Sequence, residues 1–133
     1  MAKTKPVKLL SFTLPNKVGQ LAAVAKLLGT ADVNVLALRA AEAGSNADCC
    51  IAVKNPGKAL KALASLGAEV KESDALCVLV PNKAGRLEKV TRKLAEAGIN
   101  LHAAWSTAFT GKTASCILVT SDDKKALAVL GKK

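Results

Sequence analysis

Two short segments of this 133-residue chain hold residue types that could bind a small anion. They read PNKVG at residues 15–19 and PNKAG at residues 81–85. In each segment Pro can end a strand, Asn can cap a helix, and Gly lets a ligand approach the backbone because it has no Cβ. The first N–H groups of the following helix, near residues 18–21 and 84–87, should lack partners and carry partial positive charge. Such groups suit a carboxylate or a phosphate.

No segment of the chain has a pattern of residues typical of catalysis. His102 is the single histidine, and the repeat described below places it opposite Leu36, so we expect an ordinary strand residue. The cysteines are Cys49, Cys50, Cys77 and Cys116. They form no CxxC pair and no nucleophile–base set, and in a chain without a signal peptide they indicate reduced core residues. We therefore predict no enzyme activity, no metal site and no cofactor.

The two anion-binding segments belong to an internal repeat. Shifting the chain by 66 positions places Pro15 on Pro81, and the matches keep register without a gap from residue 14 to residue 53. At the same shift Cys50 falls on Cys116, which predicts equivalent positions in the two third strands. Matches that keep register over so many residues indicate a tandem duplication.

Each copy has the pattern strand, helix, two strands, helix. The apolar runs VKLLSFTL and ALCVLV predict the first strands, and apolar residues at three- and four-residue spacing predict an amphipathic helix after each loop. Gly98 should end this helix in the second copy, and Asp32 stands at the same place in the first. Asn55 and Ser121 can cap the helices that follow the third strands.

The resulting order, βαββαβ, is the ferredoxin-like plan. We predict an α+β protein of two tandem ferredoxin-like modules with antiparallel sheets, covering residues 1–73 and residues 74–133. The segment AEVKESD predicts a fourth strand for the first copy. The second copy has only LAVLGKK left at this point, so its last strand should be missing or short, and one edge of its sheet should need cover.

Charge and hydropathy bear on the class of partner. Twenty Lys and Arg against ten Asp and Glu give a net charge of +10, which brings nucleic acids, acidic membranes and anionic ligands into consideration. The lysines are spread along the chain, which favours a solvated surface. No segment has the pattern of a signal peptide or a membrane span. We expect a cytoplasmic protein with no membrane and no nucleic-acid partner.

The motif PNKxGxLxxVxxxL, followed by Asn at the next strand, resembles the ACT domain, a small regulatory module that binds amino acids. The resemblance covers nearly the whole chain as two modules, and it is to stand-alone tandem ACT proteins, because no enzyme is attached. It implies a small amino-acid ligand. The ligand-binding residues are then Asn16, Lys17, Val18, Gly19 and Asn34 in the first copy, and Asn82, Lys83, Ala84, Gly85 and Asn100 in the second. Leu14 and Val80 stand where serine-binding members often carry a polar residue, so the amino acid is not identified.

A pocket of this kind needs more than one module. The first two strands of a βαββαβ module run parallel, so the loop asparagine and the strand asparagine of one copy should lie at opposite ends of the sheet. If the two modules of one chain paired through their second strands, the fourth strand of the first module would lie roughly 29 Å from the first strand of the second. Residues 72–74, which connect these strands, span only about 10 Å. We therefore predict a homodimer whose pockets pair Asn16 or Asn82 of one chain with Asn34 or Asn100 of the other.

Two alternatives stay open. A nucleic-acid-binding module of the same fold would stack bases on aromatic residues of its central strands, where this chain offers Phe12 alone. A regulatory subunit could instead act by protein contact without a ligand, with a metabolic enzyme as its candidate partner. Trp105, which stands opposite Arg39 in the repeat, is expected to lie in a contact between modules.

Overall fold

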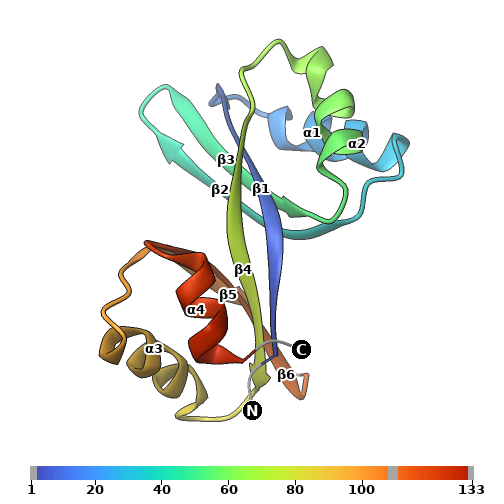
Figure 1. Cartoon of the computed structure of the whole chain (residues 1–133). Coiled ribbons are helices and arrows are strands. Elements are labelled where there is room, and N and C mark those ends of the chain that lie inside the picture. The colour runs from blue at the N-terminus through green and yellow to red at the C-terminus, as the bar shows by residue number, and fades with distance from the viewer. Residues whose placement is uncertain (1–2, 108–110, 132–133) are drawn as a thin grey trace. The chain divides into compact units, whose positions relative to one another are not determined.

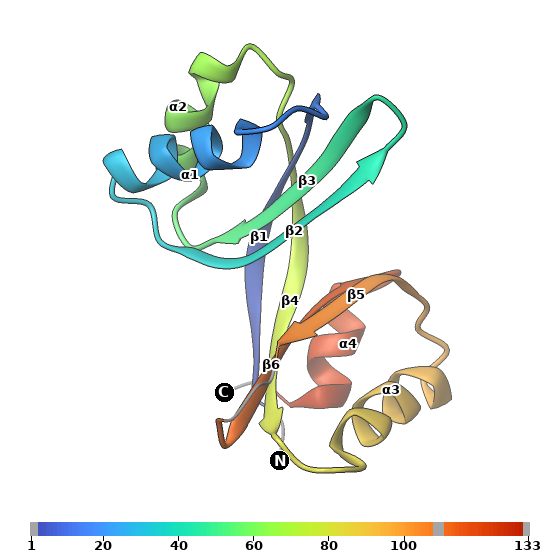
Figure 2. The same cartoon turned by 180° about the vertical axis from the view of Figure 1, so that it is seen from behind.

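The computed structural model describes residues 3–107 and 111–131. These residues form two compact units (Figures 1 and 2). The first unit is Lys8–Ser73, and the second begins at Asp74 and also takes in the start of the chain, up to Val7. Residues 3–7 therefore belong to the second unit, although they precede the first unit in the sequence.

The first unit is an antiparallel sheet with helices on one face (Figure 1). Its elements are residues 8–15 of β1 (Lys3–Pro15), α1 (Gln20–Thr30), β2 (Val35–Ala43), β3 (Asn46–Val53), α2 (Pro56–Leu63), the short 3-10 helix η1 (Ala64–Leu66) and the start of β4 (Lys71–Pro81). The strand order is β2-β3-β1, followed by β4. The Glu72 carboxylate lies 3.9 Å from the Lys8 ammonium, which places the start of β4 beside β1.

The second unit repeats this plan. Its elements are residues 3–7 of β1, the rest of β4, α3 (Arg86–Glu96), β5 (Leu101–Thr107), β6 (Thr113–Thr120) and α4 (Asp123–Leu130). The strand order is β1-β4-β6-β5, with β6 antiparallel to both of its neighbours. The predicted α+β architecture of two ferredoxin-like modules is thereby confirmed.

The N-terminal residues of the chain fill the place of the fourth strand in the second unit. Among the described residues no strand follows α4, as predicted. Residues 3–7 of β1 lie beside β4 instead, and Thr4 is completely buried there. Burial raises the pKa of the Cys77 thiol, while the nearby ammonium of Lys5 acts in the opposite direction, so Lys5 and Cys77 are close. The edge that was expected to need cover is covered by β1.

Each unit has its own apolar core between sheet and helices. In the first unit β1 contributes Leu10, Phe12 and Leu14, and α1 contributes Val24 and Leu28. The corresponding core of the second unit is built from Leu76, Val78, Val80, Val90, Leu94, Ile99, Cys116, Leu118, Ala126 and Leu130. The apolar spacing of both helices is thus confirmed for their central turns. Leu to Ala changes in such cores cost about 2–5 kcal/mol.

The gapless repeat is wrong beyond the second strand. Strand β3 begins at Asn46 and β6 at Thr113, a shift of 67 rather than 66 positions. The buried Cys116 therefore corresponds to the buried Cys49, not to Cys50. One additional residue in the β5–β6 connection produces the difference. A one-residue shift reverses the face on which every strand side chain lies. The strand pairing decides the alignment, since Pro15 pairs with Asn46 and Pro81 pairs with Thr113.

The helix ends confirm two predictions and contradict a third. Asp32 and Gly98 follow α1 and α3 with φ of 58° and 74°, as the repeat predicts for helix-terminating residues. The Asn55 side chain caps α2 by accepting from Lys58 N–H at 3.2 Å. Helix α4 is capped by Asp122, which accepts from Lys125 N–H at 3.0 Å, and not by Ser121.

Candidate functional site

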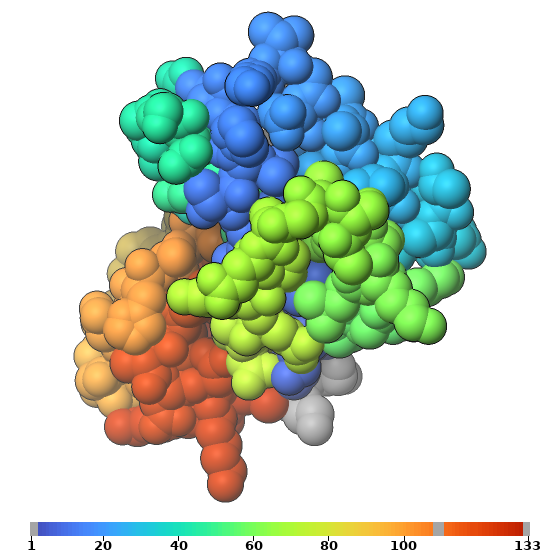
Figure 3. Space-filling model, turned by 90° about the horizontal axis from the view of Figure 1, so that it is seen from above, coloured from blue at the N-terminus to red at the C-terminus, as the bar shows by residue number. Residues whose placement is uncertain are grey.

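The two PNKxG loops are attached to the hairpin of their own unit through the backbone. Asn16 N–H donates to the Ser45 carbonyl at 3.0 Å, and Asn82 N–H donates to the Lys112 carbonyl at 2.8 Å. Figure 3 shows the first of these loops, in blue, lying against the β2–β3 turn, in teal. Because both copies keep the bond, each loop has a fixed position at the end of its sheet.

The loop asparagines do not cap the helices, contrary to the prediction. Asn16 Nδ2 donates to the Glu42 carboxylate at 2.5 Å, and Asn82 Nδ2 donates to the Gly111 carbonyl at 2.9 Å. The residues at the caps are Gly19 and Gly85, and neither helix start has a side-chain cap. Both asparagines lie on exposed loops, and no residue that the structure describes donates a hydrogen bond to either Oδ1 oxygen.

A tight turn connects each loop to its helix. Gly19 has φ 90° and ψ −6°, and Gly85 has φ 86° and ψ −10°, values that the third residue of a type II turn adopts and that favour glycine. Gln20 N–H reaches the Lys17 carbonyl at 3.4 Å, and Arg86 N–H reaches that of Lys83 at 3.3 Å. The expectation that all early helical N–H groups lack partners is therefore wrong at these two positions.

The remaining loop residues face solvent. The side chains of Lys17, Lys83 and Ala84 are exposed, and that of Val18 is fully exposed. A Cβ added at Gly19 or Gly85 would meet no atom within 4 Å. Both turns are therefore open to an approaching molecule.

The strand asparagines lie at the other end of each sheet. Pro15 and Ala43 both align with Asn46, whereas Lys8 and Val35 both align with Val53. The seven residue steps along β3 separate the two ends by about 24 Å. The first unit therefore does not bring Asn16 and Asn34 together, as the strand directions predict, and the same holds for Asn82 and Asn100 in the second unit.

The strand asparagines are exposed at the surface of their units. Asn100 is held through its backbone, since its N–H donates to Ser121 Oγ and its carbonyl accepts from Ser121 N–H, both at 2.9 Å. In the part of the chain that the structure describes, the side-chain amides of Asn34 and Asn100 form no hydrogen bond, and both residues are exposed. They are available to a ligand or to another chain.

Exposed leucines beside the loops were not predicted as functional residues. In the first unit a cavity of about 560 Å³ lies between α1 and β2, and Leu21 and Leu38 line it while remaining 42% and 46% exposed. Leu87, the counterpart of Leu21, is 52% exposed. The helical spacing suggested that both would be buried. The signal that could have revealed this surface is the alternation of Leu36 and Leu38 along an edge strand.

The described residues contain no arrangement typical of catalysis or metal binding. His102 is exposed on β5, and no group of three metal-ligating side chains occurs in the described ranges. The four cysteines are free thiols, as predicted. Burial raises the pKa of Cys49, Cys77 and Cys116, which keeps these thiols protonated and unreactive near neutral pH.

Two further predictions concern aromatic residues. Phe12 is buried in the core of the first unit, so it cannot stack on a base, and Phe109 lies outside the described residues. Trp105 is half-buried, and its Nε1 is shielded from solvent without a hydrogen-bond partner among the described residues. Its proposed place in a contact between modules stays a prediction.

No helix in the described ranges is long and apolar enough to cross a membrane.

Comparisons with known proteins give consistent results. A family model described as an ACT domain pair matches residues 5–133. Protein BT0572 from Bacteroides thetaiotaomicron is 31% identical, with a TM-score of 0.86, over 96% of this chain and 88% of that chain. No curated protein matches the sequence.

Two further solved structures share the fold at lower identity. The regulatory subunit of aspartate kinase from Thermus thermophilus, in a ligand-free form, is 19% identical with a TM-score of 0.73, over 97% of this chain and 91% of that chain. The subunit from Thermus flavus is also 19% identical, with a TM-score of 0.70, over 98% and 91% of the two chains.

Proposed function

Because this chain belongs to the ACT domain family, as an ACT domain pair, we propose that it is a non-catalytic regulatory protein that binds a small amino acid. The observation that carries the proposal is the shared construction of the two loops. Both copies keep the same glycine turn and the same bond to the hairpin, although their surroundings have diverged. In both copies an exposed asparagine precedes this turn, and among the described residues its Oδ1 accepts no hydrogen bond.

The proposed pockets lie between two copies of the chain. Since about 24 Å separates the two ends of one sheet, a single amino acid cannot contact both asparagines of a unit. The ligand would contact Asn16 or Asn82 of one chain and Asn34 or Asn100 of the other. Backbone N–H groups beside Gly19 or Gly85 would hold its carboxylate.

The sheet edges and the exposed leucines support a homodimer. Strand β2 has β3 as its single neighbour, and β5 has β6, so each ends the strand order of its unit. An uncovered edge strand can pair with another chain. In the first unit this edge lies beside the cavity that Leu21 and Leu38 line. Burial of such apolar surface stabilises association by about 25 cal/mol per Å².

Residues 72–74 do not form a connection between two strands, contrary to the expectation, because β4 runs without interruption from Lys71 to Pro81. Its start serves the first unit and the rest serves the second. Two observations support a homodimer: the edge strands, and the distance between the loop asparagine and the strand asparagine of one unit.

A thermal-shift screen with single amino acids tests the proposal. An amino acid present at 100 times its dissociation constant should stabilise the folded protein by about 2.7 kcal/mol. Substitution of Asn34 and Asn100 by Ala should abolish the shift and leave the unliganded melting temperature nearly unchanged, since neither side chain forms a hydrogen bond within the described chain. Absence of any shift across the amino acids would contradict the proposal.

A second candidate is regulation by protein contact without a ligand. The exposed leucines of α1 and β2 favour it, because an enzyme could cover this surface as well as a second copy could. Two of the proteins with the same fold are regulatory subunits of aspartate kinase, and an enzyme of amino-acid metabolism is therefore the partner we propose. The cytoplasm, where thiols stay reduced, is the proposed location.

A further inference from the structure

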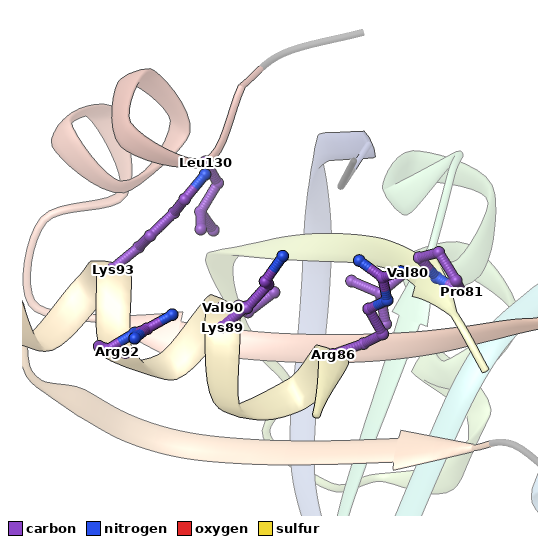
Figure 4. Close-up of a pocket in the computed structure, with 8 residues that line it drawn as sticks. All are labelled: Val80, Pro81, Arg86, Lys89, Val90, Arg92, Lys93 and Leu130. Carbon is purple, nitrogen blue, oxygen red and sulfur yellow. The ribbon is translucent and has the colours of Figure 1, made fainter. Parts of the chain in front are cut away.

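A basic pocket of about 210 Å³ lies in the second unit between α3, the end of β4 and the end of α4 (Figure 4). Its apolar lining comes from Val80, Pro81, Val90 and Leu130, most of it buried. The other four lining residues are cationic and lie on α3: Arg86, Lys89, Arg92 and Lys93. No acidic residue lines the pocket.

Within the described ranges, three of these four cations have no acidic partner. Arg92 Nε lies 3.4 Å from the Glu88 carboxylate, one helical turn away. The side chains of Arg86, Lys89 and Lys93 form no ion pair or hydrogen bond with any residue that the structure describes. Figure 4 shows Lys93 extending toward Leu130 and Arg86 toward Val80, so these two side chains point toward the apolar lining of the pocket.

The placement of these cations opposes the stability of the helix. Lys89 stands three residues after Arg86 and four before Lys93, so the like charges face one another across single turns and repel. Arg86 is also the first residue of α3, where the partial positive charge of the helix disfavours a cation. A bound anion would offset both effects.

The first copy shows that the fold does not need this charge. The positions of α1 that correspond to the four cations hold Gln20, Ala23, Lys26 and Leu27, so a single cation remains. The two helices have the same length and the same type of start. The cluster of four cations is therefore specific to the second copy and is not required by the shared fold.

We propose that this pocket binds a small anion that carries two or more phosphate groups. Two guanidinium groups can each bind phosphate oxygens in a bidentate manner, and two ammonium groups add point charges. Four cations exceed what one carboxylate requires. They converge on one pocket and do not follow a track, which favours a small molecule over a nucleic-acid strand.

The site differs from the proposed amino-acid pockets and does not depend on them. It adjoins the second loop, because Pro81 and Arg86 flank residues 82–85. Binding of phosphate groups can therefore be tested in the absence of any amino acid. A negative amino-acid screen would leave this proposal intact, and the reverse also holds.

Isothermal titration calorimetry with inorganic pyrophosphate at constant ionic strength tests the proposal. The full-length protein, the double variant Lys89→Gln/Lys93→Gln and the control Lys26→Gln are compared. Lys26 is the α1 counterpart of Arg92 and lies outside the pocket. We expect binding by the wild type, at least about tenfold weaker binding by the double variant, and no change in the control. Circular dichroism verifies that all three proteins are folded.

Absence of pyrophosphate binding by the wild type would overturn the proposal, and so would equal binding by all three proteins. ATP and tripolyphosphate in the same titration distinguish the source of the phosphate groups. Tighter binding of either one than of pyrophosphate supports the proposal and names the source, and equal binding of all three supports a site for the phosphate groups alone. Preference for a single-stranded oligonucleotide over all three small anions would overturn the proposal in favour of a nucleic-acid surface.

Discussion

At the scale of single residues, the two loops share a backbone but present different chemistry. Asn16 donates to the Glu42 carboxylate, whereas Asn82 donates to the Gly111 carbonyl. A carboxylate beside the first loop attracts the ammonium of an amino acid and repels its carboxylate. The second loop lacks this charge and precedes the basic face of α3. The two copies are therefore expected to bind the same amino acid with different affinities.

Asp32 adopts a left-handed conformation in which glycine would be more stable. Its N–H donates to the Gly29 carbonyl, and Val33 N–H donates to that of Leu28, which completes the terminal turn of α1. The ion pair of Asp32 with Lys58 is long, at 3.8 Å, and exposed. We expect Asp32→Gly to stabilise the protein by up to about 1 kcal/mol. Urea denaturation measures the change.

Gly98 provides the matched control for Asp32. It forms the same two bonds at the end of α3, with φ of 74°. Gly98→Asp should therefore destabilise the protein by about 1 kcal/mol. If both substitutions changed the free energy of unfolding in the same direction, the backbone conformation would not determine the effect.

Cys116 should make stability depend on alkaline pH. Burial raises the pKa of its thiol above the ordinary value of 9.0, and a hydrogen bond with Ser106 lowers it in part. A pKa that is higher in the folded state contributes stability below the unfolded value, and this contribution is lost as the pH rises through the folded value. The difference in unfolding free energy between wild type and Cys116→Ala should therefore shrink above about pH 9. A difference that is constant with pH would refute this.

At the scale of elements, the sequence predicted the strands and helices well and their alignment less well. Spacing alone identified the central turns of α1 and α3, because Val24, Leu28, Val90 and Leu94 must face a core. Identity matching failed after the second strand, because short apolar strands use few residue types: over residues 46–53 three identities fall at a shift of 66 and two at a shift of 67. The strand pairing, in which Pro15 faces Asn46 and Pro81 faces Thr113, was needed to decide.

The cap of α4 depends on this alignment. At a shift of 67 positions Asp122 corresponds to Asn55, and both side chains accept the N–H three residues later. We expect Asp122→Ala and Asn55→Ala each to cost about 1 kcal/mol of stability. Ser121→Ala should not disturb α4, because Ser121 bonds to Asn100 instead. Helix content after partial denaturation, measured by circular dichroism, compares the three variants.

At the scale of the whole molecule, the start of the chain completes the second unit. Sequence reasoning predicted an uncovered sheet edge but could not name its cover, because pairing between residues far apart in sequence leaves no local signal. The binding site, too, was predictable only in its local features. Residue types predicted the loop, and strand directions predicted the distance between the asparagines, whereas the exposed leucines became visible only in the folded chain.

Deletion of residues 1–7 should destabilise the second unit selectively. The deletion exposes one edge of β4 and removes the strand that carries the buried Thr4 and the Lys5 ammonium near Cys77. We expect faster amide exchange in β4 and faster reaction of Cys77 with a thiol reagent, while Cys49 in the first unit changes little. Equal acceleration at both cysteines would indicate global unfolding instead.

The central claim is that an amino acid binds between two chains, through a loop of one and a strand of the other. The most direct measurement is calorimetric titration of a mixture of two inactive variants. One variant carries Asn16→Ala and Asn82→Ala, and the other carries Asn34→Ala and Asn100→Ala. Neither homodimer has a complete pocket, whereas the mixed dimer keeps one intact set of loops and strands. We predict that mixing restores amino-acid binding, with at most half the sites of a wild-type dimer. A mixture that binds no better than its separate components, while the wild type binds, would contradict the account.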